Sequence, residues 1–122
     1  MYDHIGLQVN DLDASVRFYA AALEPLGMGL CTRDNASASF GPRDAPSLYL
    51  YAASNTPGAA AHVALRAPDR AAVRRFHACG LIAGGQDHGA PGLRADYAPT
   101  YYAAFLRDPD GNNIEAVCMS AS

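Results

Sequence analysis

The fold is decided by a stretch that occurs twice, as HIGLQVNDLDASVRFYAAA at residues 4–22 and as HVALRAPDRAAVRRFHACG at residues 62–80. The two copies align without a gap, and seven of their nineteen positions are identical, beginning with His4 and His62. A recurrence of this kind indicates two copies of one supersecondary unit. With 122 residues, the chain has the length of one compact domain that contains both copies.

The repeat divides the chain into a first module at 1–53 and a second module at 62–120, with the linker SNTPGAAA at about 54–61. Each module begins with alternating apolar and other residues, as in a strand with one buried face. A helix then starts at a capping residue, Asn10 or Asp11 in the first module and Asp69 in the second. Further strands are predicted at about 28–33, 37–41, 47–53, 81–84, 100–107 and 113–119. The prediction is therefore an α+β fold of two paired βαβββ modules that form a cupped mixed sheet.

Strand parity places the two repeated histidines on the sheet face opposite the helices. Ile5, Leu7 and Val9 alternate with His4 in the first module, and the second module repeats the pattern from His62. The last strand follows the turn DPDGNN at 108–113 and alternates so that Glu115 shares this face. If the modules pair about a pseudo-two-fold axis, the three side chains converge. Two imidazoles and one carboxylate suit one divalent metal ion, with Fe, Mn, Ni and Zn all open.

Composition excludes several other classes of function. The net charge is −3 and the nine basic residues, all arginines, are scattered, whereas nucleic-acid binding requires a concentrated basic surface. No apolar run approaches the length of a membrane span. The three cysteines form neither a CxxC motif nor an even set, which favours a reducing compartment, and we expect a cytoplasmic protein.

The segment GGQDHGAPGLRADYAPT at 84–100 is predicted to be a long loop over the mouth of the cup. In it, His88, Arg94 and Tyr97 would supply an acid or base, an anion contact and a hydrogen bond; a plain solvated loop is the alternative. Of the two neighbouring tyrosines that follow, Tyr101 has the parity of Phe105 and is expected to face the cup.

The segments HIGLQVNDLDASVRFY, HVAL and YYAAFLRDPDGNNIEAV resemble the vicinal oxygen chelate superfamily, which includes glyoxalase I, bleomycin-resistance proteins, fosfomycin-resistance transferases and extradiol dioxygenases. The resemblance covers essentially the whole chain and is specific for the fold, whereas one fold hosts many reactions. It implies that the metal ligands are His4, His62 and Glu115, and that the protein is a homodimer.

Three positions depart from the named subfamilies. Tyr49 stands where glyoxalase I has a fourth ligand, and Phe105 stands where extradiol dioxygenases have a tyrosine. The segment after Glu115, AVCMSAS, lacks the arginine expected of a fosfomycin transferase. These departures leave the reaction open.

The leading hypothesis is a metal-dependent enzyme whose small substrate chelates the ion through vicinal oxygens, in a lyase or isomerase reaction or in a ring-cleaving oxygenation. Glu115, Tyr101 and His88 are the candidate catalytic residues, and the candidate substrate contacts are Tyr49, Arg94, Tyr97 and Phe105. One alternative is a non-catalytic dimer that binds a drug or metabolite in an aromatic pocket formed by Tyr49, Tyr51, Tyr101 and Phe105. A second alternative is a subunit or a regulator that has kept the fold and lost its activity.

Overall fold

The computed structural model describes residues 1–43, 45–53 and 61–122, so most of the predicted linker lies outside the described residues. The first module contains β1 (Ile5–Val9), α1 (Leu12–Leu23), the short 3-10 helix η1 (Glu24–Leu26), β2 (Gly29–Arg33), β3 (Ser37–Gly41) and β4 (Leu48–Ala52). The second contains β5 (His62–Arg66), α2 (Arg70–Ile82), β6 (Gln86–Leu93), β7 (Tyr102–Arg107) and β8 (Asn113–Cys118). The predicted βαβββ unit is therefore present twice.

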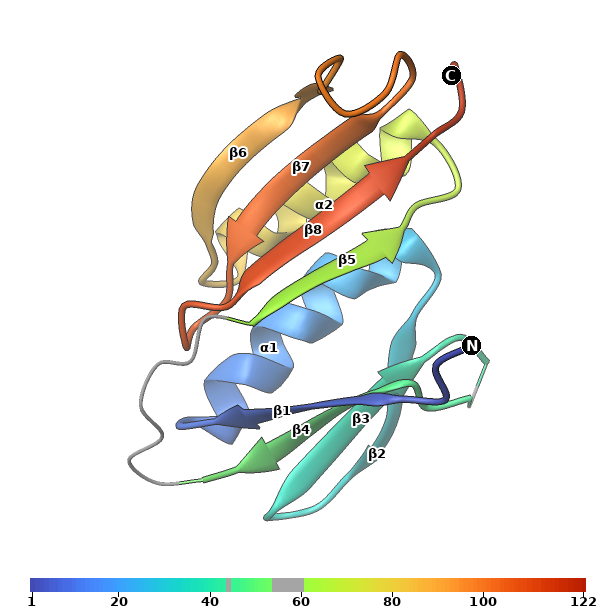
Figure 1. The fold of residues 1–122 in the computed structure, drawn as a ribbon. Helices are drawn as coiled ribbons and strands as arrows, with labels where there is room; N and C mark the ends of the chain where they lie inside the picture. Colours follow the sequence, from blue (N-terminus) through green and yellow to red (C-terminus); the bar gives the residue numbers. More distant parts are fainter. Residues whose placement is uncertain (44, 54–60) are drawn as a thin grey trace.

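Each module forms its own four-stranded mixed sheet (Figure 1). The strand order is β1-β4-β3-β2 in the first, called sheet A, and β5-β8-β7-β6 in the second, called sheet B. The first strand runs parallel to the last strand of its module, and the other pairs are antiparallel. The α+β prediction is confirmed, and β1 and β5 each lie at the edge of a sheet.

The two helices begin as the repeat predicts and lie against one face of each sheet. The side chain of Asp11 accepts a hydrogen bond from the backbone of Ala14 at 3.1 Å, and Asp69 caps α2 in the same way at 2.7 Å. α1 and α2 also pack against each other, which joins the two modules (Figure 1). Among the described residues, no helix is long and apolar enough to cross a membrane.

Two predictions in the second module are wrong. The segment predicted as a strand at 81–84 is instead the end of α2 and the turn after it, because Gly80 lies inside the helix, where its missing side chain lets Leu106 approach closely. The first half of the predicted loop at 84–100 is β6. Pro91 is tolerated there because β6 is the outer strand of sheet B, and two register shifts against β7 accommodate the glycines.

The DPDGNN turn fastens the second module to the first. The buried carboxylate of Asp108 accepts a hydrogen bond from the hydroxyl of Tyr19 in α1 at 2.5 Å. Asp110 accepts hydrogen bonds from the backbone and side chain of Asn10, both at 2.9 Å, and from the hydroxyl of Ser15 at 3.4 Å. The turn therefore sets the position of the last strand relative to the first helix.

Candidate functional site

The candidate site lies on the open face of sheet B, which is the face opposite α2. His62 begins β5, and Glu115 lies in the middle of the neighbouring strand β8. Glu115 is level with Ala64 on one side and with Phe105 of β7 on the other, so these three side chains share a face. The alternation of β8 therefore places Glu115 on the open face, as the sequence predicts.

His62 and Glu115 lie within interaction distance of each other. Nε2 of His62 is 3.1 Å from Oε1 of Glu115, and Nδ1 of His62 is 3.2 Å from the carbonyl oxygen of Asn113. In the tautomer that donates its Nδ1 proton to this carbonyl, the Nε2 lone pair points at a carboxylate. The lone pair and the carboxylate oxygen repel each other unless a proton or a cation lies between the two atoms. A backbone carbonyl behind the imidazole is also the usual support of a metal-binding histidine.

Glu115 is only 2 % exposed although it lies on the open face, whereas the His62 side chain is about half exposed. Tyr101 donates a hydrogen bond to Oε2, the carboxylate oxygen that does not face His62. Burial and then the hydrogen bond to Glu115 raise the pKa of Tyr101 to about 12, so its hydroxyl stays protonated at neutral pH. Tyr101 is therefore suited to hold one oxygen of Glu115 while the other oxygen faces His62.

The remaining candidates of the second module form a pocket beside this pair. It has a volume of about 390 Å³ and is lined by His88, Gly89, Arg94, Tyr97, Phe105 and Asn113. The Phe105 ring stacks on His62, with a distance of 6.3 Å between the ring centroids, and the Arg94 guanidinium lies 5.4 Å from the Phe105 centroid. Tyr97 packs edge-on against Tyr101 at 5.1 Å. The pocket and the His62–Glu115 pair thus share one wall.

His4 lies apart from the His62–Glu115 pair. It directly precedes β1, where its Nδ1 is 2.7 Å from a carboxylate oxygen of Asp3 and its ring packs edge-on against Tyr49 at 5.2 Å. In the described part of the chain, no group of three or more His, Cys, Asp or Glu side chains is close enough to hold one ion. The fold therefore brings His62, Glu115 and Tyr101 together and leaves His4 apart within one chain.

Asn113 is not among the residues predicted from the sequence, although it contributes two polar groups to this site. Its carbonyl oxygen faces His62, and its side-chain oxygen is buried with no hydrogen-bond partner among the described residues. The only sequence signal was its place at the start of β8, directly opposite His62 in the register. That signal requires knowing that β5 and β8 are neighbours.

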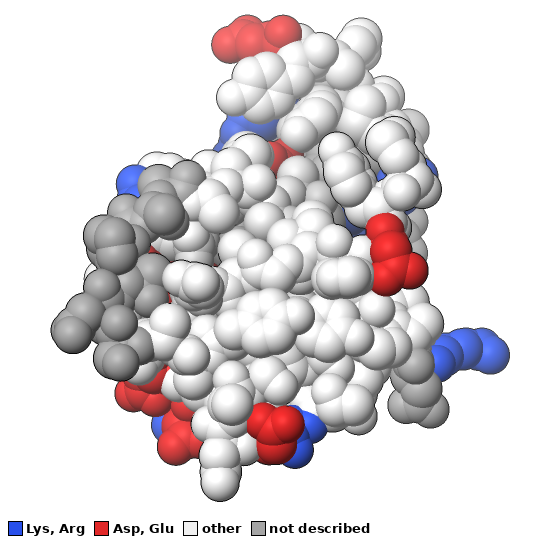
Figure 2. Space-filling model, turned by 60° about the horizontal axis from the view of Figure 1, so that its bottom comes forward, with Lys and Arg blue, Asp and Glu red and all other residues white. Residues whose placement is uncertain are grey.

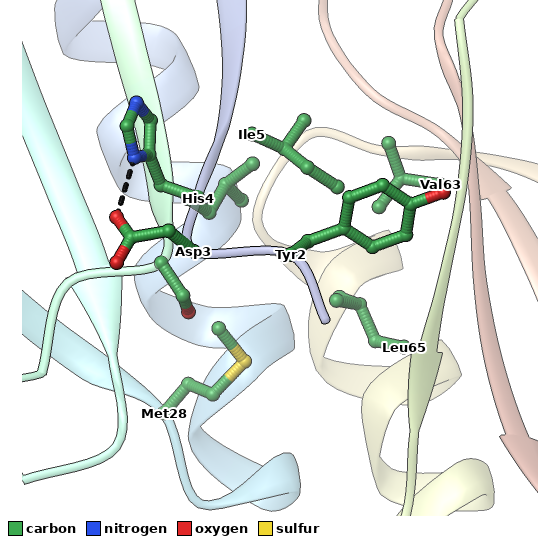
Figure 3. Close-up of a pocket in the computed structure, with 9 residues that line it drawn as sticks. Tyr2, Asp3, His4, Ile5, Met28, Val63 and Leu65 are labelled. Atoms are coloured by element: carbon green, nitrogen blue, oxygen red, sulfur yellow. Dashed lines mark hydrogen bonds and ion pairs between the residues drawn. The ribbon is translucent and has the colours of Figure 1, made fainter.

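The edge strands β1 and β5 face one another across a small apolar cavity of about 130 Å³ (Figure 3). Tyr2 points across it to Val63 and Leu65 of β5, whereas His4 and Asp3 lie together on the other side (Figure 3). No strand pairing between β1 and β5 joins the two sheets in the described structure. The modules are thus held together by side chains and by the helices, and the site histidines do not meet along this edge.

The open face of sheet A is poor in charge. Figure 2 brings the lower part of Figure 1 forward and shows a broad uncharged area with the charged residues around its rim. The large apolar side chains that this module exposes are Met1, Tyr2, Ile5, Leu30 and Tyr51. On the open face of sheet A, Tyr49 and Tyr51 lie nearly parallel, with ring centroids 6.0 Å apart. This surface has the character of a binding surface.

Comparisons with known proteins agree with this architecture. Residues 2–116 match the family model of the Glyoxalase/Bleomycin resistance protein/Dioxygenase superfamily. The structure is similar to that of a glyoxalase/bleomycin resistance protein from Albidiferax ferrireducens, with 31 % identity, a TM-score of 0.84, and coverage of 97 % of this chain and 98 % of that one. None of the curated proteins matches the sequence.

Two further structures extend the comparison. A glyoxalase I variant from Zea mays is 27 % identical with a TM-score of 0.72, and the match covers 95 % of this chain and 45 % of that one. The bleomycin resistance determinant encoded on transposon Tn5 is 24 % identical, with a TM-score of 0.65 and coverage of 93 % and 92 %, and it supports the fold alone. Since the family model spans nearly the whole sequence, the chain belongs to the Glyoxalase/Bleomycin resistance protein/Dioxygenase superfamily.

Proposed function

We propose that the protein is a metal-dependent enzyme whose small substrate binds one divalent ion through two adjacent oxygens. His62 and Glu115 of one chain and His4 of a second chain would hold the ion. The observation that carries the proposal is the His62–Glu115 pair, in which an imidazole nitrogen lies 3.1 Å from a buried carboxylate oxygen. Imidazole and carboxylate ligands fit Fe(II), Mn(II), Ni(II) and Zn(II).

A second copy of the chain is proposed because one chain supplies only part of the ligand set. His4 is exposed on the first module, and the open face of that module is uncharged and aromatic (Figure 2). β1 and β5 are both edge strands, and an exposed edge is a surface that a partner can cover. A two-fold symmetric dimer that sets the first module of each chain against the second module of the other would complete two identical sites.

The residues around the site would have different roles in binding and catalysis. A divalent ion bound there would act as a Lewis acid on the substrate oxygens that bind it. Tyr101, whose pKa of about 12 keeps it protonated, would hold Glu115 in place through its hydrogen bond. His88 lines the neighbouring pocket and is the candidate acid or base, while Phe105 and Tyr97 would form the wall against which the substrate lies.

The proposed metal site is tested by measuring the binding of divalent ions to purified protein that carries no affinity tag. We expect about one ion per chain in the wild type and at least a tenfold loss of affinity for His62→Ala and for Glu115→Ala. Glu24→Ala is the matched control, since Glu24 is the other glutamate of the sequence and is exposed. The proposal would be contradicted if the wild type and Glu115→Ala had equal metal content, both as purified and after incubation with Fe(II), Mn(II), Ni(II) or Zn(II).

The two candidate reaction classes differ in their use of dioxygen. A ring-cleaving oxygenation consumes dioxygen in proportion to product, whereas a lyase or isomerase reaction does not. Measuring dioxygen uptake during turnover of a candidate substrate by the Fe(II)-loaded protein therefore separates the two. Uptake that matches product assigns an oxygenase, and turnover under anaerobic conditions assigns a lyase or an isomerase.

The second candidate function is binding without turnover, and the stacked Tyr49–Tyr51 pair favours it. Aromatic rings on an uncharged sheet face bind planar apolar molecules and need no ion. A ligand that raises the melting temperature equally with and without chelator would support this function. Loss of the stabilisation on adding chelator would instead favour the metal-dependent enzyme.

A further inference from the structure

The pocket beside the His62–Glu115 pair contains an arginine that has no acidic partner among the described residues. Arg94 donates hydrogen bonds to the carbonyl oxygens of Gly92 at 2.9 Å and Ala90 at 2.8 Å, and its guanidinium lies over the Phe105 ring. None of the ion pairs between described residues involves Arg94. Since a guanidinium has five N–H donors, these two bonds leave donors for a ligand.

Two glycines in the neighbouring backbone leave room for the Arg94 side chain. A Cβ atom added at Gly89 would lie 2.8 Å from the Phe105 ring and 3.3 Å from Nη2 of Arg94, and one added at Gly92 would lie 3.3 Å from Nη1. The two glycines therefore provide the space in which the guanidinium lies over the ring. Fixing an arginine in this way lowers the entropy that it loses when it binds an anion.

The same pocket contains a polar group that the protein leaves unsatisfied. Asn113 lines the pocket, and its side-chain oxygen has no hydrogen-bond partner in the described structure. An amide can exchange its oxygen and nitrogen by rotation about its last torsion, so it can meet a donor or an acceptor. A ligand hydroxyl, which both donates and accepts, would satisfy the amide in either orientation.

We propose that this pocket binds a small hydroxycarboxylate, with the carboxylate on Arg94 and a hydroxyl on the amide of Asn113. The proposal rests on the proposed function, because it names the substrate class of the same site. The pocket would hold these two groups, and other oxygens of the same substrate would bind the ion. One arginine matches one negative charge. A dianion such as a phosphonate is disfavoured, because Glu115 lies beside the pocket and the chain has a net charge of −3.

The test uses 3-hydroxybenzoate, its isosteric amide 3-hydroxybenzamide, benzoate, which lacks the hydroxyl, and phenylphosphonate. Dissociation constants are measured by calorimetry on the full chain, first with a chelator and then with Mn(II). The variants are Arg94→Gln, Asn113→Ala and the control Arg75→Gln, which makes the same charge change at an exposed position of α2. Circular dichroism and the melting temperature of each variant establish that it is folded.

In the wild type, 3-hydroxybenzoate should bind at least about tenfold more tightly than 3-hydroxybenzamide, because the amide lacks the charge that Arg94 recognises. Arg94→Gln should remove this preference and Arg75→Gln should keep it. 3-Hydroxybenzoate should bind more tightly than benzoate in the wild type and equally in Asn113→Ala. These differences are expected with chelator present, so they do not depend on a metal.

Three results would overturn the proposal. The first is an unchanged affinity of Arg94→Gln for 3-hydroxybenzoate, and the second is tighter binding of phenylphosphonate than of benzoate. The third is no binding of any carboxylate by the wild type at millimolar concentration. The metal site is judged separately, by the metal content of the wild type and of Glu115→Ala. A failed carboxylate pocket with intact metal binding therefore leaves the proposed function standing.

Discussion

At the scale of single residues, the feature that matters most is a buried carboxylate on a sheet face that is otherwise open. Glu115 is 2 % exposed, and its two oxygens face two different partners, His62 and Tyr101. A buried carboxylate without compensating partners is costly, and such groups are concentrated at functional sites. The local arrangement therefore points to binding chemistry at this position.

Tyr101→Phe removes the hydroxyl that holds one oxygen of Glu115 and keeps the aromatic ring. If Glu115 binds a metal, we expect the affinity to fall by about 10-fold or more, as for other groups that orient a ligand. Competition with a metal-sensitive dye measures the change. The control is Tyr102→Phe, since Tyr102 lies beside Arg70 and Arg74 at the other face. Equal affinities of Tyr101→Phe and the wild type would contradict this role.

Tyr19 gives a prediction about alkaline pH. Burial, followed by the charge of Asp108, raises the pKa of Tyr19 well above 10. The unfolded chain ionises this group near pH 10 and the folded chain does not, so its stabilising effect is complete below pH 10 and is lost at higher pH. Wild-type stability should therefore fall through this group as the pH rises from 10 to 11.

Tyr19→Phe should be less stable than the wild type by about 1–2 kcal/mol at pH 8, because Asp108 loses a buried hydrogen bond. At pH 11 the difference should shrink, because phenylalanine does not ionise. Urea unfolding at both pH values measures the change, and Tyr2→Phe at an exposed position is the control. A difference that stays constant between pH 8 and pH 11 would contradict the assigned pKa shift.

At the scale of elements, the DPDGNN turn connects a strand, a helix of the other module and the site. Gly111 has φ of +91°, a left-handed conformation that other residues adopt only with strain. The Asp108 side chain accepts hydrogen bonds from the backbone of Asp110 at 2.9 Å and of Asn112 at 2.8 Å, which closes the turn. The start of β8, and with it the place of Glu115, is fixed by this turn.

Gly111→Ala should destabilise the fold by about 1–2 kcal/mol because of its positive φ. Gly29→Ala is the matched control, since an added Cβ meets nothing within 4 Å and φ is not in the left-handed region. Thermal or urea unfolding measures both variants. Equal losses for the two substitutions would show that the left-handed backbone of the turn is not the cause.

At the scale of the whole molecule, the two modules are related by sequence but contribute differently to the site. The second module supplies His62, Glu115 and the pocket with Arg94, whereas the first supplies His4 and the Tyr49–Tyr51 pair. The helices and the Asp110 contacts to Asn10 and Ser15 fix the modules to each other within one chain. The proposed three-ligand site would then require the first module of another chain.

Mixing two variants that cannot bind metal tests this arrangement. A dimer of one His4→Ala chain and one Glu115→Ala chain would contain one intact site and one that lacks both ligands. After the two variants are unfolded together and refolded in equal amounts, about one quarter of all sites should bind metal, since half of the dimers are mixed. No recovery of metal binding in the mixture would contradict a site shared between chains.

Much of the fold could be predicted from residue patterns, because those patterns act over short distances. The caps at Asp11 and Asp69 are local hydrogen bonds, and the alternation of β1 and β8 needs only the period of two in a strand. The prediction of a loop at 84–100 was wrong because its glycines and Pro91 are typical of loops. An outer strand with register shifts tolerates them, and a sequence does not reveal which strand is outermost.

By itself, the sequence determined the two modules, the face on which His4, His62 and Glu115 lie, and the turn that precedes the last strand. Only the tertiary structure decided that Glu115 meets His62 and Tyr101 but not His4, and that Arg94 lies over Phe105. It also decided that the side-chain oxygen of Asn113 has no hydrogen-bond partner within the described ranges. The physical reason is distance along the chain. Periodicity fixes the side of a strand on which a residue lies, whereas the residue opposite it depends on strand pairing and module packing between segments 11 to 53 residues apart.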